Sequence, residues 1–202
     1  QFYGGNLCVL SLKDGSVRDL VPSMRHGIFG RFDLSFDARK VVFDWKADPD
    51  SGFRIYEVGT DGSGLRQLTF PPADEPRRIE KYRHRSLVSW AGKPVTYKHF
   101  TDDLHPCYLP DGGIAFVSTR CEHGILCDGP DLFTVTVIYR MDADGGHIEK
   151  LSNSALSEST PSLTNDGCLL YTRWEYVDKG ARVAKVVWTM NPDGGRPQEL
   201  YG

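Results

Sequence analysis

The run Val137-Ile138-Tyr139-Arg140-Met141-Asp142-Ala143-Asp144-Gly145 is a β-rich stretch that ends in an Asp-Gly turn, and the chain repeats this phrase. Equivalent runs end at Asp14-Gly15, Asp61-Gly62 and Asp193-Gly194, so successive turns lie 47, 83 and 49 residues apart. Strand-like units with a period in the upper forties are typical of β-propellers, and the longest step is one period that carries an insertion. The sequence therefore predicts an all-β fold, a β-propeller.

A second kind of hairpin lies upstream of these runs. Pro110-Asp111-Gly112 precedes the apolar run Ile114-Ala115-Phe116-Val117, and Asn165-Asp166-Gly167 precedes a similar run later in the chain. Asp and Gly suit these turns because tight hairpins need residues that tolerate positive φ. The apolar residues are consecutive and do not alternate, which indicates strands that are covered on both faces. We therefore expect four-stranded antiparallel blades that stack face to face.

The hairpin spacing predicts a partial arc of about three and a half blades. Its parts, in chain order, are an outer half blade, a blade, an insertion and two further blades, at residues 1–21, 22–70, 71–100, 101–152 and 156–202. The insertion contains the one helix-compatible stretch, residues 75–85. The chain opens inside a repeat without a signal peptide, so we expect a processed product or a piece of a longer protein. An open arc would expose apolar faces at both ends, so the other blades or domains of the parent are expected partners, without which the arc is aggregation-prone.

Antiparallel alternation sorts the connections onto two rims. The Asp-Gly turns are expected on one rim, and residues 71–104, 120–131 and 173–182 on the other, here called the irregular-loop rim. Because irregular loops on rigid scaffolds carry function, we expect binding residues there. The candidates are Asp102, Asp103, His105, Arg120, His123, Arg173, Trp174, Glu175, Tyr176 and Asp178.

Two of these groups have two interpretations each. Asp102, Asp103 and His105, with His99, lie just before a first strand, where they would face a central channel as metal or proton-handling groups, or would cap the start of the blade. The run 173–178 would line a central pocket, or would form a salt-bridged rim whose aromatic rings fill the gap to the next blade.

Cys121 and Cys127 are separated by five residues of a hairpin-like loop. This spacing suits a disulfide in an oxidising compartment, and two free thiols or a metal site are the alternatives. The metal site would need His123, with His105 or Cys107, as further ligands.

Two other charged segments also have open interpretations. A basic cluster in the insertion would grip an anionic partner or would be a solvated surface; it comprises Arg77, Arg78, Lys81, Arg83, His84 and Arg85. Asp142-Ala143-Asp144-Gly145 resembles the start of a calcium loop but lacks the closing acidic ligand, so a local turn is expected.

The composition excludes several classes of function. The chain has 24 basic and 27 acidic residues, a net charge of −3, which gives no general attraction to nucleic acid or to an anionic membrane. The sequence contains no apolar run of 18 residues, the length that a membrane-spanning helix needs. The sequence lacks a nucleophile elbow, a P-loop, a dinucleotide fingerprint and a CxxCH haem motif, so no catalytic residue is assigned.

The blade ends Gln67-Leu68-Thr69 and Lys150-Leu151-Ser152 resemble the WD40-like repeats of TolB-type propellers. Longer phrases resemble the middle-domain propeller of hydrazine synthase alpha-subunit-like proteins, at residues 101–116, 118–121, 139–145 and 170–180. The resemblance covers about residues 20–202. It implies a secreted or periplasmic protein in which the propeller is one domain among several. The haem-attaching motif of hydrazine synthase has no match in this chain.

These features predict a non-catalytic extracytoplasmic propeller module that binds a protein or small-molecule partner through the irregular-loop rim and holds no cofactor of its own. The alternative is the propeller domain of a haem or metal redox protein whose cofactor-attaching segments lie outside this chain. A weaker alternative is the gating propeller of a prolyl-peptidase-like enzyme.

Overall fold

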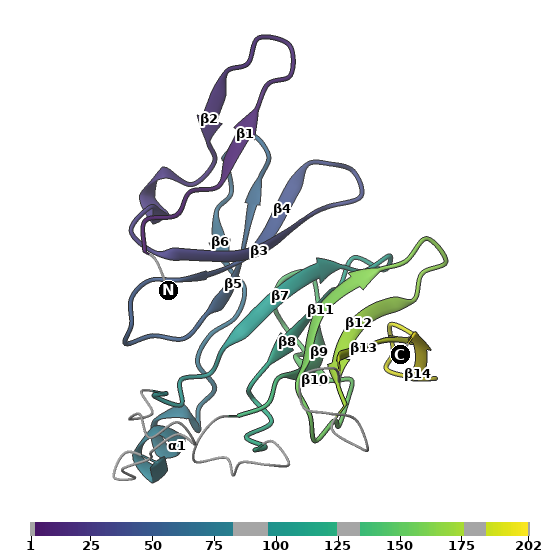
Figure 1. Ribbon diagram of the computed structural model, residues 1–202. Coiled ribbons are helices and arrows are strands. Elements are labelled where there is room, and N and C mark those ends of the chain that lie inside the picture. Colours follow the sequence, from purple (N-terminus) through teal and green to yellow (C-terminus); the bar gives the residue numbers. More distant parts are fainter. Residues whose placement is uncertain (1–2, 83–96, 125–133, 176–184, 202) are drawn as a thin grey trace.

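The computed structural model describes residues 3–82, 97–124, 134–175 and 185–201. They form three four-stranded antiparallel sheets, each a meander in chain order, and one two-stranded hairpin. Figure 1 shows the hairpin and the sheets following one another along an arc. This confirms the predicted all-β fold, a partial propeller.

The strand bounds give each blade its four strands. The hairpin consists of β1 (Cys8–Leu10) and β2 (Val17–Asp19), and a 3-10 turn at Pro22–Met24 follows it. The first sheet consists of β3 (Ile28–Leu34), β4 (Lys40–Lys46), β5 (Arg54–Gly59) and β6 (Arg66–Gln67). The second consists of β7 (Asp103–Tyr108), β8 (Ile114–Ser118), β9 (Val137–Met141) and β10 (Glu149–Lys150). The third consists of β11 (Glu158–Leu163), β12 (Leu169–Trp174), β13 (Lys185–Met190) and β14 (Gln198–Tyr201).

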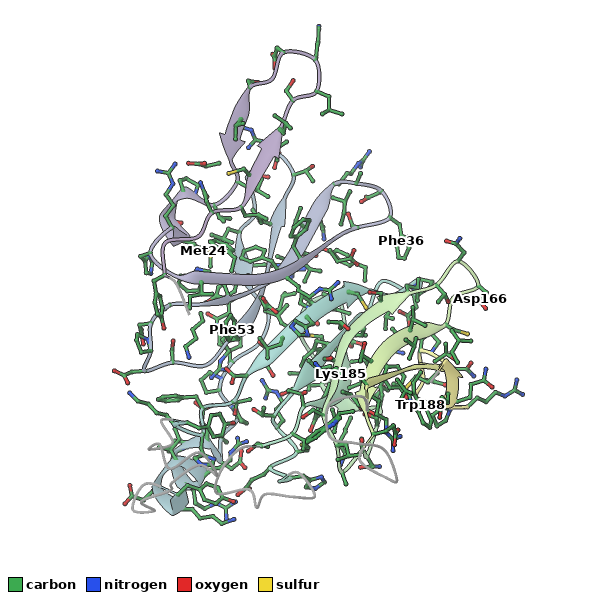
Figure 2. All side chains as sticks on the ribbon, viewed as in Figure 1. Met24, Phe36, Phe53, Asp166, Lys185 and Trp188 are labelled. Carbon is green, nitrogen blue, oxygen red and sulfur yellow. The ribbon has the colours of Figure 1, made fainter. Side chains whose placement is uncertain are left out.

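Apolar clusters fill the spaces between successive units. Met24 lies between the hairpin and the first sheet, where it packs in one cluster with Phe43 and Trp45 (Figure 2). Val42 and Ile55 point the other way, into the cluster shared with the second sheet. Because adjacent residues of one strand face different blades, all five residues of β4 from Val41 to Trp45 are buried. The consecutive apolar residues of this strand are therefore explained as predicted, because the strand is covered on both faces.

The first strand of each sheet lies on the inner side of the arc, and β7 contacts both β3 and β11. Each of the three is interrupted by a bulge, between Phe29 and Phe32, between Leu104 and Cys107, and between Ser159 and Ser162. A bulge leaves residues unpaired and turns their backbone away from the ladder. The bulge residue His105 and the bulge residue Thr160 both have a φ of 54°.

The predicted insertion contains a short helix, α1 (Glu75–Tyr82), inside the helix-compatible stretch. Figure 1 places α1 at the opposite end of the molecule from the turn between β1 and β2. Figure 2 shows Phe36, on the turn after β3, and Asp166, on the turn after β11, away from α1 as well. The described turns and the helix thus lie on opposite rims. No helix in the described ranges is long and apolar enough to cross a membrane.

Candidate functional site

A buried ion pair fixes the start of β7. The carboxylate of Asp103 is fully buried and accepts hydrogen bonds from Arg120 Nε at 3.0 Å, Arg120 Nη2 at 2.7 Å and Ser118 Oγ at 2.7 Å. Arg120 also donates to the carbonyl of Phe70 at 2.8 Å. A two-pronged Arg–carboxylate pair is among the stronger polar contacts in proteins. Asp103 and Arg120, two of the predicted binding residues, thus pair with each other and connect β7 to Phe70, the last residue before the insertion.

Helix α1 docks through charged side chains, and its buried residues are Glu75, Arg78 and Tyr82. Glu75 accepts the backbone N–H of Thr101 at 2.6 Å and forms an ion pair with Arg54 at 3.2 Å. Arg78 is 2% exposed and donates to Thr119 O and to Thr101 Oγ1. Buried charges need such partners, so these contacts hold the helix against the first two sheets. Neither interpretation of the basic cluster, an anion grip or a solvated surface, fits Arg78.

A polar chain crosses the inner side of the arc. Asp44 is fully buried, and its carboxylate accepts the backbone N–H of Arg31 at 2.7 Å and that of His105 at 2.6 Å. His105 Nδ1 in turn accepts the backbone N–H of Thr160 at 3.2 Å. Burial raises the pKa of Asp44 to about 6, and burial lowers the pKa of His105 to about 4. At neutral pH His105 is therefore an uncharged acceptor that links the second sheet to the third.

Asp102 lies beside a cleft on the irregular-loop rim. Its Oδ1 accepts the backbone N–H of Phe53 at 2.9 Å, and burial raises the pKa of the carboxyl. The cleft has a volume of about 310 Å³ and is lined by Lys46, Pro49, Phe53, Tyr97, Lys98, Phe100 and Asp102. Lys46 Nζ lies 5.8 Å from the centre of the Phe53 ring. Lys98 forms an ion pair with Asp50.

Three rings pack against one another beside this cleft. His99 lies between Tyr82 of α1, at 4.2 Å between ring centres, and Tyr97, at 4.5 Å. Glu122 accepts hydrogen bonds from Lys81 at 3.0 Å and from the Tyr82 hydroxyl at 3.2 Å. These ring contacts therefore join the cleft wall to helix α1 and to the segment after β8.

The group at 173–178 is described only in part. Arg173 Nε approaches Glu175 Oε1 to 2.9 Å, and the Arg173 guanidinium lies 4.6 Å from the Trp188 ring centre. Trp174, the last residue of β12, is half-buried. Tyr176 and Asp178 lie outside the described residues.

The cysteine loop is also described only in part. Cys121 Sγ donates to the carbonyl of Val135 at 3.5 Å, and His123 is exposed. Cys127 lies outside the described residues, so the Cys121–Cys127 disulfide stays a prediction. Across the ranges that the structure describes, no three His, Cys, Asp or Glu side chains are grouped so that they could hold a metal ion.

Sequence reasoning missed four residues that shape this rim or the inner side of the arc. They are Asp44, Lys46, Phe53 and Glu75. Asp44 interrupts an apolar strand with a charge, Val41-Val42-Phe43-Asp44-Trp45, and this was the one local signal that could have identified it. Lys46 and Phe53 gave no signal because they become neighbours only when the β4–β5 connection folds back toward residues 97–102.

The stacked antiparallel sheets, the bulged inner strands and the two rims define a β-propeller. No family model matches the sequence, and no curated protein matches it. In solved structures the arrangement is similar to the hydrazine synthase of Kuenenia stuttgartiensis, with a TM-score of 0.71 and 17% identity over 99% of this chain. A TolB-type protein of Agrobacterium tumefaciens has a TM-score of 0.62 and 18% identity over 97% of this chain.

An oligogalacturonate lyase, solved in complex with manganese, is similar as well, with a TM-score of 0.58 and 15% identity over 98% of this chain. This chain spans 28% of the hydrazine synthase chain, 56% of the TolB-type chain and 48% of the lyase chain. At these identities the likeness establishes the fold, and it confirms the predicted resemblance to hydrazine synthase and TolB-type propellers. Function must come from the residues of the site.

Proposed function

We propose that this propeller segment is a non-catalytic binding module that takes its partner at the irregular-loop rim. The cleft beside Asp102 is the observation that carries the proposal, because it joins aromatic walls to the Lys46 and Lys98 ammonium groups. Concave sites with apolar walls and a few polar groups are the usual form of ligand pockets. The Asp103–Arg120 pair and the docked α1 give this rim a fixed base.

The chemistry of the cleft favours a ligand with an acidic group and a flat apolar body. Lys98 is paired with Asp50. Lys46 lies over Phe53 and its charge also acts on the Asp102 carboxyl, so we assign Lys46 as the cation that an anionic ligand would share with Asp102. A small organic acid, or an acidic side chain beside an aromatic one on a protein partner, offers both features. No cofactor is assigned to these residues, and a haem or metal ion in the parent protein would be held by segments outside this chain.

Saturation-transfer NMR with phenylacetate tests the cleft. Wild-type protein is expected to transfer magnetisation to the phenylacetate ring, and Lys46→Met to abolish the transfer. Lys13→Met, on the exposed turn of the hairpin, is the matched control and should transfer like wild type. Equal transfer in all three proteins would contradict the proposed site.

We further propose that the module works outside the cytoplasm, in the periplasm or after secretion, as the sequence resemblance implies. Fractionation of cells that express the full-length gene product tests this. Recovery of the protein with cytoplasmic markers would contradict it. Alkylation of Cys121 and Cys127 before and after reduction provides a second readout, because disulfides persist in oxidising compartments.

A further inference from the structure

The same contact joins each pair of neighbouring units at the outer edge of the arc. The glycine of an Asp-Gly turn in one unit lies against the carbonyl of a leucine that ends the preceding unit. A Cβ added to the glycine would lie 3.4 Å, 2.3 Å and 2.7 Å from that oxygen in the pairs Gly62–Leu20, Gly145–Leu68 and Gly194–Leu151.

An arginine of the preceding unit reinforces each contact by donating to carbonyls of the turn. The donors and acceptors are Arg18 to Thr60 and Asp61, Arg66 to Ala143, and Arg140 to Pro192. Three successive junctions therefore share one arrangement with two halves. One half is an Asp-Gly turn with its glycine and carbonyl groups, and the other is the leucine that ends the preceding unit.

The hairpin at the start of the arc presents the turn half of this arrangement, and no described residue lies against its glycine. The Leu20 N–H donates to Leu7 O as the Leu68 N–H donates to Ile55 O, so β1 and β2 correspond to the outer strands β5 and β6. A Cβ added to Gly15 would meet nothing within 4 Å.

In this register Leu10 stands where the other units carry Val58, Met141 and Met190. Those three residues are at most 2% exposed, whereas Leu10 is 56% exposed and Val17, its cross-strand partner, is 64% exposed. We call Leu10, Val17 and the Gly15 turn the N-edge.

The third sheet presents the other half of the contact, the leucine that ends a unit. Leu200 stands where Leu20 and Leu68 stand, since Gln198 and Glu199 pair with β13 as Arg66 and Gln67 pair with β5. Leu20 and Leu68 are 3% and 2% exposed, whereas Leu200 is 59% exposed. Val187, which corresponds to the fully buried Ile55, is half-buried. We call Leu200 and Val187 the C-edge.

We propose that the N-edge of one copy of this chain docks on the C-edge of a second copy. The two edges carry the two halves of a contact that the arc already makes three times, so the docking continues an established interface. It would seat the turn at Gly15 on the carbonyl of Leu200 and cover Leu10 with Val187. The edges differ, so the contact is head-to-tail and leads to a ring if the rotation closes. Two arcs bring six four-stranded sheets and two hairpins, eight units in all, within the range of about four to eight blades that closes a propeller.

Sedimentation of the 202-residue chain and of two edge variants tests the docking. Wild type is expected to associate into dimers or larger species as its concentration rises. Leu10→Glu and Leu200→Glu should each be monomeric, because each has lost one half of the contact. An equimolar mixture of the two variants should recover a species of twice the monomer mass, since one variant keeps the C-edge and the other keeps the N-edge.

Phe36→Glu is the control, since Phe36 is 70% exposed but belongs to neither edge, and it should associate like wild type. Circular dichroism melting of each variant shows whether it is folded. A monodisperse wild-type monomer would overturn the proposal, as would association of either single variant alone. A mixture of folded variants that stays monomeric would overturn it as well.

Discussion

Gly145→Ala should weaken the junction between the first and second sheets more than an ordinary turn mutation does. Gly145 has a φ of +90°, where an L side chain is strained by roughly 1–2 kcal/mol. The new Cβ would also lie 2.3 Å from Leu68 O, closer than a van der Waals contact allows. Relieving such overpacking typically costs a further 1–3 kcal/mol or so. We therefore expect the free energy of unfolding to fall by about 2–5 kcal/mol.

Gly112→Ala is the matched control for that substitution. Gly112 has nearly the same φ, +87°, but a Cβ there meets nothing within 4 Å, so only the backbone term of about 1–2 kcal/mol applies. Gly194→Ala, with its Cβ 2.7 Å from Leu151 O, should fall between the two. Urea unfolding of the three variants at one pH measures the midpoints, and an unchanged m-value shows that the same surface unfolds. A loss for Gly112→Ala as large as that for Gly145→Ala would refute the reasoning.

Three further predictions concern burial and charge. Asp103→Asn should cost about 3–5 kcal/mol in urea unfolding, because it leaves the Arg120 charge partly buried without its carboxylate. His105→Asn keeps a residue that tolerates the φ of 54°. Because the folded pKa of His105 is lowered to about 4, its contribution to stability is present above its unfolded pKa and is lost as pH falls toward 4. The wild type should therefore gain stability over His105→Asn between pH 4 and neutrality, and a pH-independent difference would count against this. Leu34→Ala, at a position that is 48% exposed, should cost under about 1 kcal/mol, whereas Leu109→Ala, at a fully buried one, should cost about 2–5 kcal/mol in the same assay.

The fold was predictable because its signals are local. An Asp-Gly turn needs only its own positive φ, as at Gly112 and Gly167, and a consecutive apolar run reflects coverage on both faces of one strand. Both signals recur in each blade, so the repeat identified the architecture even though no single segment did. The helix at Glu75–Tyr82 was also predictable from a local signal, because it lies inside the one helix-compatible stretch of the sequence.

The site was less predictable because its contacts join residues far apart in the chain. Arg78 lies in a run of basic residues that suggested a surface, yet it is buried against Thr101 and Thr119, which are 23 and 41 residues away. Nothing within the run distinguishes Arg78 from the exposed Arg77. His105 was identified as a candidate, but its role as an acceptor for Thr160 depends on bulges in β7 and β11, and a bulge has no strong sequence signature when neither residue is glycine.

The repeated Asp-Gly phrase itself encodes more than a hairpin. If the turn alone required glycine, each glycine would face open space, as Gly112 and Gly167 do. In the turns between third and fourth strands, Gly145 and Gly194 instead lie so close to a leucine carbonyl that a Cβ would collide with it. Glycine at these positions therefore satisfies two requirements, the positive φ of its own hairpin and the close approach of the preceding blade. At Gly145 and Gly194 the phrase therefore constrains the position of the preceding blade as well as the local turn, so replacing either glycine should disturb both.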